Sequence, residues 1–558
     1  MPARFPARLR GSPWLRALGL FVASLALAVA VHGFSLSFGF DYDDYHLLRP
    51  YTPREVAATF HGPWDPSGIE VPFYRPLTTT FYAARFWVLG VDAWKYHALS
   101  LLMFSGAAAL FGLFAALVAG RWWAGALTAA VYVLHPAMPR SQVVWATNQM
   151  HLLSSLVVGA TLAWWAARGR SGRGWWWAIA ATVVAFLIKE DGIMLLPLVV
   201  GLQLLWRTLV ERGGAWPPLK WVAAGALAVL ALLALRYAAL GGMGGYTARP
   251  TLERMWVNYQ PGARIGFLAM RSDRWYLWPW AETFVKAALA AGVLACVLLR
   301  QARLAFLLLA GVLSAALFNL PFVLVTKAEQ YHLIASFSAV SIAAALAAVW
   351  GAIPRRWWRV TIGATIVAGL LVLAAASRHR GELFTPYTTW TMGHDTVAAD
   401  WPGMPAEIRE WLREGLRERR QPAIGPLSNL PVIVFGAPDF ETDPQGRKVR
   451  WLGRHTTILP NAGVGVLELP LLASLPAGSS CRVVVATQDG PAATVSLRNA
   501  ESVTVKVPVR QRGRLFALAR RVTITVTPEP RAGTAEGTAQ APERAIGLGE
   551  IRCLPRKR

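Results

Sequence analysis

Long apolar runs recur along the chain, and they constrain its fold more than any other feature. Each run is about 17 to 25 residues long, and about 20 apolar residues are enough for a helix to cross a bilayer. We therefore predict an α-helical polytopic membrane protein with about eleven transmembrane helices. The runs fall near 14–36, 96–119, 122–138, 147–167, 174–188, 192–209, 220–240, 278–299, 304–325, 331–350 and 358–377, of which 122–138 and 174–188 are short.

The composition agrees with a membrane protein. Of the 558 residues, 55% are hydrophobic and only 16% are charged, whereas a soluble domain has about 25% charged residues. The net charge of +25 does not indicate nucleic-acid binding, because the Lys and Arg residues form short clusters between the apolar runs. Loops that face anionic lipid carry such clusters. We expect membrane lipid around the chain and no nucleic-acid partner.

The distribution of charge between the loops predicts the orientation. With the N-terminus inside, the inside segments are rich in Arg and Lys and carry a single acid, Glu211, whereas the outside segments also carry acids. Since basic loops stay in the cytoplasm, we expect a bacterial inner-membrane protein with a cytoplasmic N-terminus. The first run is too long for a cleaved signal peptide, so we predict an uncleaved anchor. Two outside loops, 37–95 and 241–277, are long enough to indicate a function.

After about residue 378 the composition changes, which predicts a second domain. We expect a transmembrane domain over 1–378 and a periplasmic α+β domain over 379–558. Segments with period-two alternation and β-branched residues indicate strands of a β-sandwich core, preceded by a helix at 406–420. The predicted strands are Leu430–Phe435, Val464–Leu469, Arg482–Thr487, Ala493–Arg498, Val503–Val509 and Val522–Thr527.

The second domain also contains a stretch of biased composition and two of the three cysteines. The stretch Pro528–Glu543 is rich in Ala, Gly, Thr and Pro, which predicts a flexible loop. Cys481 and Cys553 could form one disulfide if the domain is exported. The third cysteine, Cys296, lies inside an apolar run, and no Cys or His spacing is typical of a metal site.

The first outer loop opens with FDYDDYHLL, which contains Asp41, Asp43 and Asp44. A carboxylate at the membrane surface costs desolvation free energy unless it has partners. Asp43 and Asp44 are adjacent and their side chains tend to diverge, so one could accept a proton from a hydroxyl while the other holds a cation or an acceptor. The structural alternative is a solvated loop start. Later in this loop, Leu77–Leu89 is amphipathic and predicts a short helix along the membrane surface.

Other polar groups lie at the ends of the apolar runs. In FYRPL, Tyr74 precedes Arg75, which could bind a phosphate through two hydrogen bonds or extend to lipid headgroups. His97 lies at the start of the second run, and Asn148 and His151 lie at the start of the fourth. An interfacial role is the ordinary alternative for His97.

Two short outer turns carry charges of both signs. The turn LIKEDGIM contains Lys189, Glu190 and Asp191, whose charges either neutralise each other or meet a ligand. The turn VTKAEQYHL adds Glu329, Gln330, Tyr331 and His332. Polar groups from four separate turns thus fall on one face of the predicted bundle, which is the arrangement of a ligand site at a membrane surface.

In this order the motifs resemble the GT-C superfamily of membrane glycosyltransferases. The segments DDYHLL and FYRPL are similar to the first outer loop of that family, and AGALTAAVYVLHPA with QVVWATNQMHLLSS resembles its next spans. Lys189-Glu190 matches a "KE" turn, and Glu329-Gln330-Tyr331 resembles an "ERY" motif. The pattern covers about residues 14–350 and is most similar to TMTC-type protein O-mannosyltransferases and their bacterial relatives.

The resemblance implies a reaction and roles for residues. The family transfers a sugar from a polyprenyl-phosphate donor and uses an acid of the first outer loop as the base. It places the catalytic pair on Asp43 and Asp44, with Asp43 as the base. Contacts to the donor phosphate would come from Arg75, Lys189, Gln330 and Tyr331, with support from Tyr74, His97, Asn148, His151, Glu190, Glu329 and His332.

The sequence departs from the family in three places. Gln330 stands where an Arg is expected, 148–151 reads NQMH where the family often has an Arg-Lys-Asp run, and a β-rich domain replaces C-terminal TPR repeats. The acceptor therefore stays open among protein, lipid and polysaccharide. Two adjacent Asp residues permit a divalent metal, although no complete ligand set is visible. Direct displacement at the sugar carbon would invert its configuration.

Two other functions remain open from the sequence. One is a lipid or solute transporter or flippase, although transporters tend to hold their charges near the midplane, and here the charges fall at the ends of the runs. The other is a non-catalytic membrane scaffold with the same fold.

Overall fold

The chain divides into two compact units. Unit 1 comprises Met1–Phe38, Arg54–Thr79 and His97–Pro386, and unit 2 comprises Gly39–Pro53, Thr80–Tyr96 and Tyr387–Arg558. The domain boundary predicted near 378 stays a prediction. The computed structural model describes residues 13–40, 44–67, 72–138, 143–168, 175–211, 219–242, 244, 251–253, 255–257, 259–260, 278–321, 332–353, 356–382, 405–417, 430, 432–437, 440–443, 445–461, 464–487, 489–509, 521–529 and 545–555.

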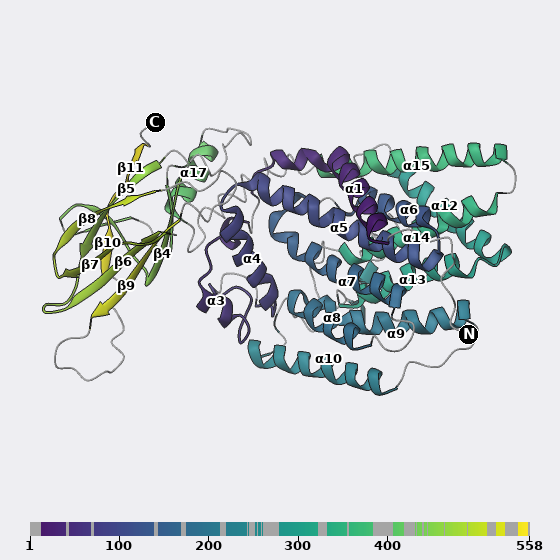
Figure 1. Ribbon diagram of the computed structural model, residues 1–558, viewed down its shortest axis with the longest axis horizontal. Coiled ribbons are helices and arrows are strands. Elements are labelled where there is room, and N and C mark those ends of the chain that lie inside the picture. Colours follow the sequence, from purple (N-terminus) through teal and green to yellow (C-terminus); the bar gives the residue numbers. More distant parts are fainter. Residues whose placement is uncertain are drawn as a thin grey trace. The chain divides into compact units, whose positions relative to one another are not determined.

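Unit 1 is a bundle of apolar helices (Figure 1). Within the described ranges, nine helices are long and apolar enough to cross a membrane, and two apolar helices are shorter. The long ones are α1 (Pro13–His32), α5 (Ala93–Ala119), α7 (Gln149–Arg168), α9 (Leu195–Trp206, extended by short turns to Glu190–Glu211), α10 (Leu219–Leu240), α12 (Trp278–Leu298), α13 (Ala302–Asn319), α14 (His332–Ala352) and α15 (Arg356–Glu382). The shorter ones are α6 (Trp122–Leu134) and α8 (Trp175–Ile188). The structure therefore confirms the predicted runs, including the two short ones.

Small residues explain how closely these helices pack. Helix α14 lies between α6, α12 and α13 (Figure 1). A Cβ atom on Gly311 of α13 would lie 2.1 Å from the hydroxyl oxygen of Ser341 in α14, and that hydroxyl donates a hydrogen bond to the carbonyl of Leu308 at 3.0 Å. Helices in lipid gain little from the hydrophobic effect, so close backbone approach and such hydrogen bonds hold them together.

The loop between α1 and α5, predicted to be the first outer loop, forms short helices. These are α2 (Asp44–Leu47), α3 (Pro53–Ala58) and α4 (Pro76–Leu89). Pro53 and Pro76 each stand at the first helical position, where the fixed φ of proline favours the helix and its missing N–H costs nothing. Helix α4 confirms the helix predicted at Leu77–Leu89, while its position along a membrane surface stays a prediction. Most of the second long loop lies outside the described residues.

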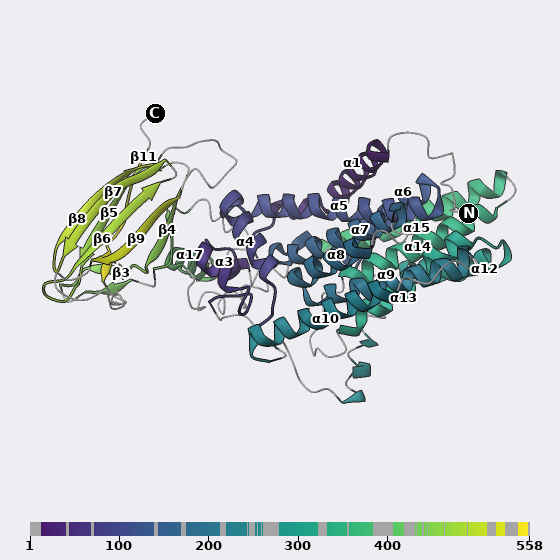
Figure 2. The ribbon, with the colours of Figure 1, turned by 60° about the horizontal axis from the view of Figure 1, so that its bottom comes forward.

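Unit 2 contains two antiparallel sheets. One has the strand order β1-β4-β9-β6-β7, and the other has β11-β5-β10-β3-β2 with β8 also paired to β5. Figure 2 shows the long strands of both sheets running in nearly the same direction, as in an aligned sandwich. The strands are β1 (Val432–Phe435), β2 (Glu441–Thr442), β3 (Lys448–Trp451), β4 (His455–Pro460), β5 (Val464–Ala473), β6 (Ser480–Thr487), β7 (Gly490–Arg498), β8 (Ser502–Pro508), β9 (Val522–Glu529), β10 (Ile546–Leu548) and β11 (Arg552–Pro555), and helix α17 (Ala406–Arg417) packs against β1.

A single apolar core joins the two sheets. It combines inward residues of both, such as Val434, Ile458, Val483 and Ile524 from the first sheet with Leu467, Leu469, Val507 and Leu548 from the second. All six predicted strands are present, as β1 and β5 to β9, so the predicted β-sandwich core is confirmed. The helix predicted at 406–420 is present as α17.

One expectation for this unit needs correction, and the disulfide that the sequence left open is not formed. Strand β9 continues to Glu529, and its Pro528 pairs with Cys481 of β6, so the loop predicted at Pro528–Glu543 begins too early, and its remainder lies outside the described residues. No disulfide joins Cys481 to Cys553 in the structure. The first lies on β6 and the second on β11, which belong to different sheets.

Candidate functional site

A tight glycine turn connects α8 to α9 and carries three charged residues. The amide of Gly192 donates to the carbonyl of Lys189 at 2.9 Å. A Cβ on Gly192 would lie 2.3 Å from the carbonyl carbon of Ala185, so only glycine fits against the end of α8. The sequence KEDG therefore closes the turn directly on the helix and fixes where Lys189, Glu190 and Asp191 begin.

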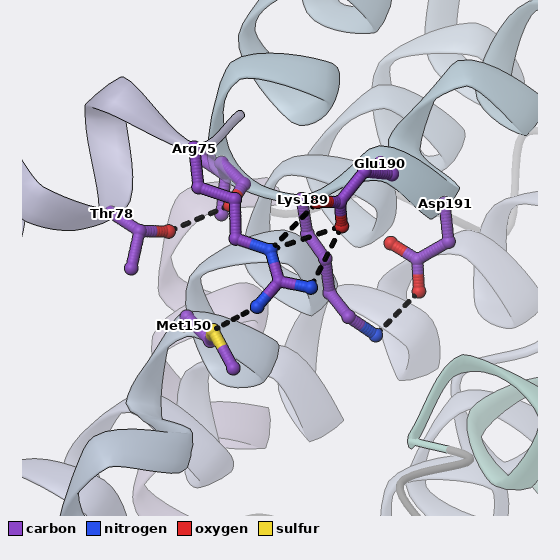
Figure 3. Close-up of polar contacts among 7 residues, drawn as sticks. Arg75, Thr78, Met150, Lys189, Glu190 and Asp191 are labelled. Atoms are coloured by element: carbon purple, nitrogen blue, oxygen red, sulfur yellow. Dashed lines mark hydrogen bonds and ion pairs between the residues drawn. The ribbon is translucent and has the colours of Figure 1, made fainter. Parts of the chain in front are cut away.

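Arg75, directly before α4, binds the carboxylate of Glu190 with two nitrogens (Figure 3). Its Nε donates to Oε1 and Oε2 of Glu190 at 3.0 Å each, and its Nη2 lies 2.9 Å from Oε2. The side chains are 8% and 15% exposed, respectively. A two-pronged, largely buried pair of this kind is strong and geometrically specific.

Further contacts fix the guanidinium of Arg75 in place. It lies over the ring of Phe73, 3.9 Å from the ring centroid, and its Nη1 is 3.7 Å from the sulfur of Met150 at the start of α7. One turn later in α4, the hydroxyl of Thr78 donates to the carbonyl of Ile188 at 2.6 Å (Figure 3). The first turn of α4 is thereby tied to both α7 and the α8–α9 turn.

A second buried ion pair lies within the turn itself. Lys189 Nζ donates to Asp191 Oδ2 at 2.8 Å, and the two side chains are 7% and 4% exposed (Figure 3). The other carboxylate oxygen, Oδ1, is buried and accepts no hydrogen bond from the described part of the chain. An unsatisfied buried oxygen costs about 1 to 3 kcal/mol, so this oxygen is suited to accept a hydrogen bond from a ligand. Asp191 was not among the predicted site residues.

Arg236 of α10 joins this cluster and was also missed. It interacts electrostatically with Glu190 and Arg75, and it is half-buried four residues before the end of α10. Leu232, one turn earlier, packs with Tyr74 and Phe186, which brings this end of α10 beside the α8–α9 turn. The signal in the sequence was one Arg within the apolar stretch LALLALRYAAL, since a charge inside a span usually has a function.

Tyr74, one of the predicted site residues, makes a structural hydrogen bond. Tyr74 is buried and its hydroxyl donates to the carbonyl of Phe60 at 3.1 Å. Burial raises the pKa of this phenol above its ordinary value, so it stays protonated and keeps its donor. Tyr74 therefore supports the first turn of α4.

The selected residues near α5 and α7 are buried in helix packing. The Nδ1 atom of His97 is 3.2 Å from the carbonyl oxygen of Val143. His97 and His151 are fully buried and Asn148 is 2% exposed, so these side chains are enclosed by the helix packing. Asn148 and His151 flank Met150, whose sulfur contacts Arg75.

Asp44 belongs to unit 2, where it is fully buried as the first residue of α2. The solvated alternative is therefore wrong for this carboxylate. It interacts electrostatically with Tyr96. Arg85, also in unit 2, places its guanidinium 4.0 Å from the ring centroid of Tyr82 and 5.3 Å from that of Tyr96. Asp44 thus begins a buried polar and aromatic group.

Several selected residues lie outside the described residues. They are Asp43, Glu329, Gln330 and Tyr331, and the side chain of His332 at the start of α14 is outside them as well. Among the residues that the structure describes, no group of three His, Cys, Asp or Glu side chains could hold a metal ion. The structure brings together Arg75, Glu190, Lys189 and Asp191, with Arg236.

The fold and this cluster define a class: a multi-pass helical membrane protein with two buried ion pairs at one turn of its bundle and a β-sandwich unit. No model of a known protein family matches the chain. Over 190 residues it is 25% identical to the human protein O-mannosyl-transferase TMTC2. The aligned segment makes up 31% of this chain and 23% of that protein. The chain thus matches about a quarter of that relative's length, and the match agrees with the resemblance that the motifs indicate.

Two kinds of solved structure are also similar. The oligosaccharyltransferase of Archaeoglobus fulgidus in its apo form is 12% identical, with a TM-score of 0.42 over 74% of this chain and 60% of that one. The arabinofuranosyltransferase AftD from Mycobacteria is 12% identical, with a TM-score of 0.37 over 97% and 58%. Similarity at this level leaves the function to be argued from the residues of this chain.

Proposed function

We propose that this protein is a membrane glycosyltransferase that moves a sugar from a polyprenyl-phosphate donor to an acceptor hydroxyl on the periplasmic face. The observation that carries the proposal is the cluster at the α8–α9 turn. Three cations and two carboxylates gather there from α4, α10 and the turn. Charges are expensive at the edge of a bilayer, and they persist where they serve a ligand.

The similarity to a protein O-mannosyl-transferase supports the same reaction class. A lipid-linked sugar keeps its phosphate at the membrane surface and its apolar tail among the helices. A cationic cluster at the end of a helical bundle suits both parts of such a donor. The enzyme then has to position the acceptor and stabilise the leaving phosphate.

The proposed step is a direct displacement. A carboxylate of the first outer loop, with Asp43 as first choice, takes the proton from the acceptor hydroxyl. The acceptor oxygen then bonds to the anomeric carbon of the sugar while the bond from that carbon to the phosphate oxygen breaks. Polyprenyl phosphate leaves with the additional negative charge, and the configuration of the sugar carbon inverts.

Arg75, Lys189, Gln330 and Tyr331 are the proposed contacts to the donor phosphate. Arg75 and Lys189 each already bind a carboxylate in the structure, so each would share its charge between that carboxylate and the phosphate. Asp44, buried next to Asp43 in the chain, is proposed to orient the catalytic loop. A divalent metal between the two adjacent acids stays open.

Transfer of label from a radiolabelled polyprenyl-phosphate sugar tests the proposal. Purified full-length protein is incubated with the donor and a membrane extract, and label is followed from the lipid into the acceptor fraction. We expect Asp43→Asn to reduce transfer by about 100-fold or more, since a positioned base contributes about 10²–10⁴-fold. Glu55→Gln is the matched control, because it removes an acid from α3 in the same loop.

Three results would separate the alternatives. Full activity of Asp43→Asn removes this residue as the base, and Asp44→Asn then tests its neighbour. No transfer from any polyprenyl-phosphate sugar by folded protein contradicts the proposal and favours a scaffold. Movement of the intact donor between bilayer leaflets without loss of its sugar favours a flippase.

A further inference from the structure

Among the residues that the structure describes, the charges at the α8–α9 turn do not cancel. Arg75, Lys189 and Arg236 are cations, and only Glu190 and Asp191 are anions. The described part of the cluster therefore holds one positive charge more than its carboxylates balance. A charge that is partly removed from water and has no partner is costly, so this surplus favours a bound anion.

The surplus charge can be assigned to one residue. Arg75 occupies both oxygens of Glu190, and Lys189 occupies an oxygen of Asp191. Arg236 interacts with Glu190 only at longer range, since no ion pair joins them within the described part of the chain. Its Nε atom is buried and finds no hydrogen-bond acceptor among the described residues.

The position of Arg236 suits an anion at the end of the bundle. It lies four residues before the end of α10, which is roughly 6 Å along the helix axis. Leu232 packs on Tyr74 and Phe186. Gly244, which follows α10, packs closely against Pro72. A Cβ on Gly244 would lie 2.8 Å from the carbonyl oxygen of Pro72. These contacts hold the last turns of α10 against the segment that carries Arg75.

We propose that Arg236 binds the phosphate of the lipid-linked donor, in addition to the contacts proposed for Arg75 and Lys189. The inference rests on the proposed function and adds a binding residue to it. The phosphodiester of a polyprenyl-phosphate sugar carries one negative charge, which matches the surplus. A guanidinium forms two parallel hydrogen bonds to a phosphate, and the unsatisfied Nε of Arg236 is available for one of them. A donor with a diphosphate would carry more negative charge than the described cluster balances.

Binding of polyprenyl phosphate and of polyprenol, which has the same tail without the phosphate, tests this inference. Both probes are titrated as radiolabelled lipids into full-length protein in detergent. We expect Arg236→Gln to weaken the binding of polyprenyl phosphate about 10- to 100-fold, since a hydrogen bond to a charged group contributes about 1.5 to 3 kcal/mol. Polyprenol binding should not change. Arg236→Lys should retain part of the affinity, because it keeps the charge and loses the two-pronged geometry.

Lys220→Gln is the matched control, because it removes one positive charge from the exposed opposite end of α10. Equal affinities of wild type and Arg236→Gln for polyprenyl phosphate, with polyprenol bound more weakly by both, would overturn the inference and leave the proposed function standing. A wild type that binds the phosphate no better than the alcohol would overturn both. An Arg236→Gln protein that also loses polyprenol would show a structural role for Arg236 and contradict the inference.

Discussion

At the scale of single residues, the Arg75–Glu190 pair is the contact on which the candidate site depends. Both side chains are largely buried, so removing one partner leaves the other charge uncompensated. We expect Glu190→Gln or Arg75→Gln to destabilise the protein by up to about 3 to 5 kcal/mol. The measurement is thermal unfolding in detergent, and each single variant should unfold at a clearly lower temperature than wild type.

A double variant and a surface pair provide the controls. Arg75→Met with Glu190→Leu should recover much of the loss, because no charge is then left buried without a partner. Glu282→Gln breaks the Lys286–Glu282 pair of α12, whose lysine is 59% exposed, and should change stability by less than about 1 kcal/mol. Single variants of Arg75 and Glu190 that unfold like wild type would show that the pair does not hold α4 to the turn.

At the scale of elements, the turn between α8 and α9 requires glycine at 192. We expect Gly192→Ala to move the turn away from α8, because its Cβ would overlap the backbone of Ala185. Polyprenyl-phosphate binding should fall at least about tenfold, which corresponds to about 1.4 kcal/mol. Gly201→Ala is the matched control, since nothing lies within 4 Å of a Cβ at that position of α9. Equal affinity of the two variants would contradict this account of the turn.

The elements themselves were predictable where their pattern is long. Each apolar run gave a helix, and alternation over six or more residues gave β1 and β5 to β9. Strands β10 and β11 have three and four residues, too few for a period to show. They are strands because Leu548 and Cys553 pair with the distant strand β5, and the sequence alone does not contain that pairing.

Several residues of the site were predictable from the sequence, but the ion pairs between them were not. The motifs selected Arg75, Lys189 and Glu190, yet Arg75 and Glu190 are 115 positions apart, and no spacing rule pairs residues at that distance. Asp191 was noted only as part of the charged turn, because its burial and its unsatisfied oxygen follow from packing. Arg236 was missed since it lies inside an apolar run that was assigned to a span.

At the scale of the whole molecule, the proposed reaction requires a defined orientation of the protein in the membrane. We expect the N-terminus and the α9–α10 connection to face the cytoplasm, and the β-sandwich of unit 2 to face the periplasm, because the basic loops stay inside. A membrane-impermeant thiol reagent should label a cysteine introduced at Asp489 in intact cells, in a background without the native cysteines. A cysteine introduced at Arg212 should react only after lysis, and the reverse pattern would contradict the orientation.

The central claim is that the end of the bundle formed by Arg75, the α8–α9 turn and Arg236 holds the phosphate of a lipid-linked sugar. Photocrosslinking tests it most directly, with a polyprenyl phosphate that carries a photoreactive group beside the phosphate, followed by peptide mapping. The account predicts crosslinks within 72–78, 186–194 and 232–244, which excess unlabelled polyprenyl phosphate should suppress. Saturable crosslinks confined to the opposite ends of these helices, around Arg207 or Lys220, would contradict it.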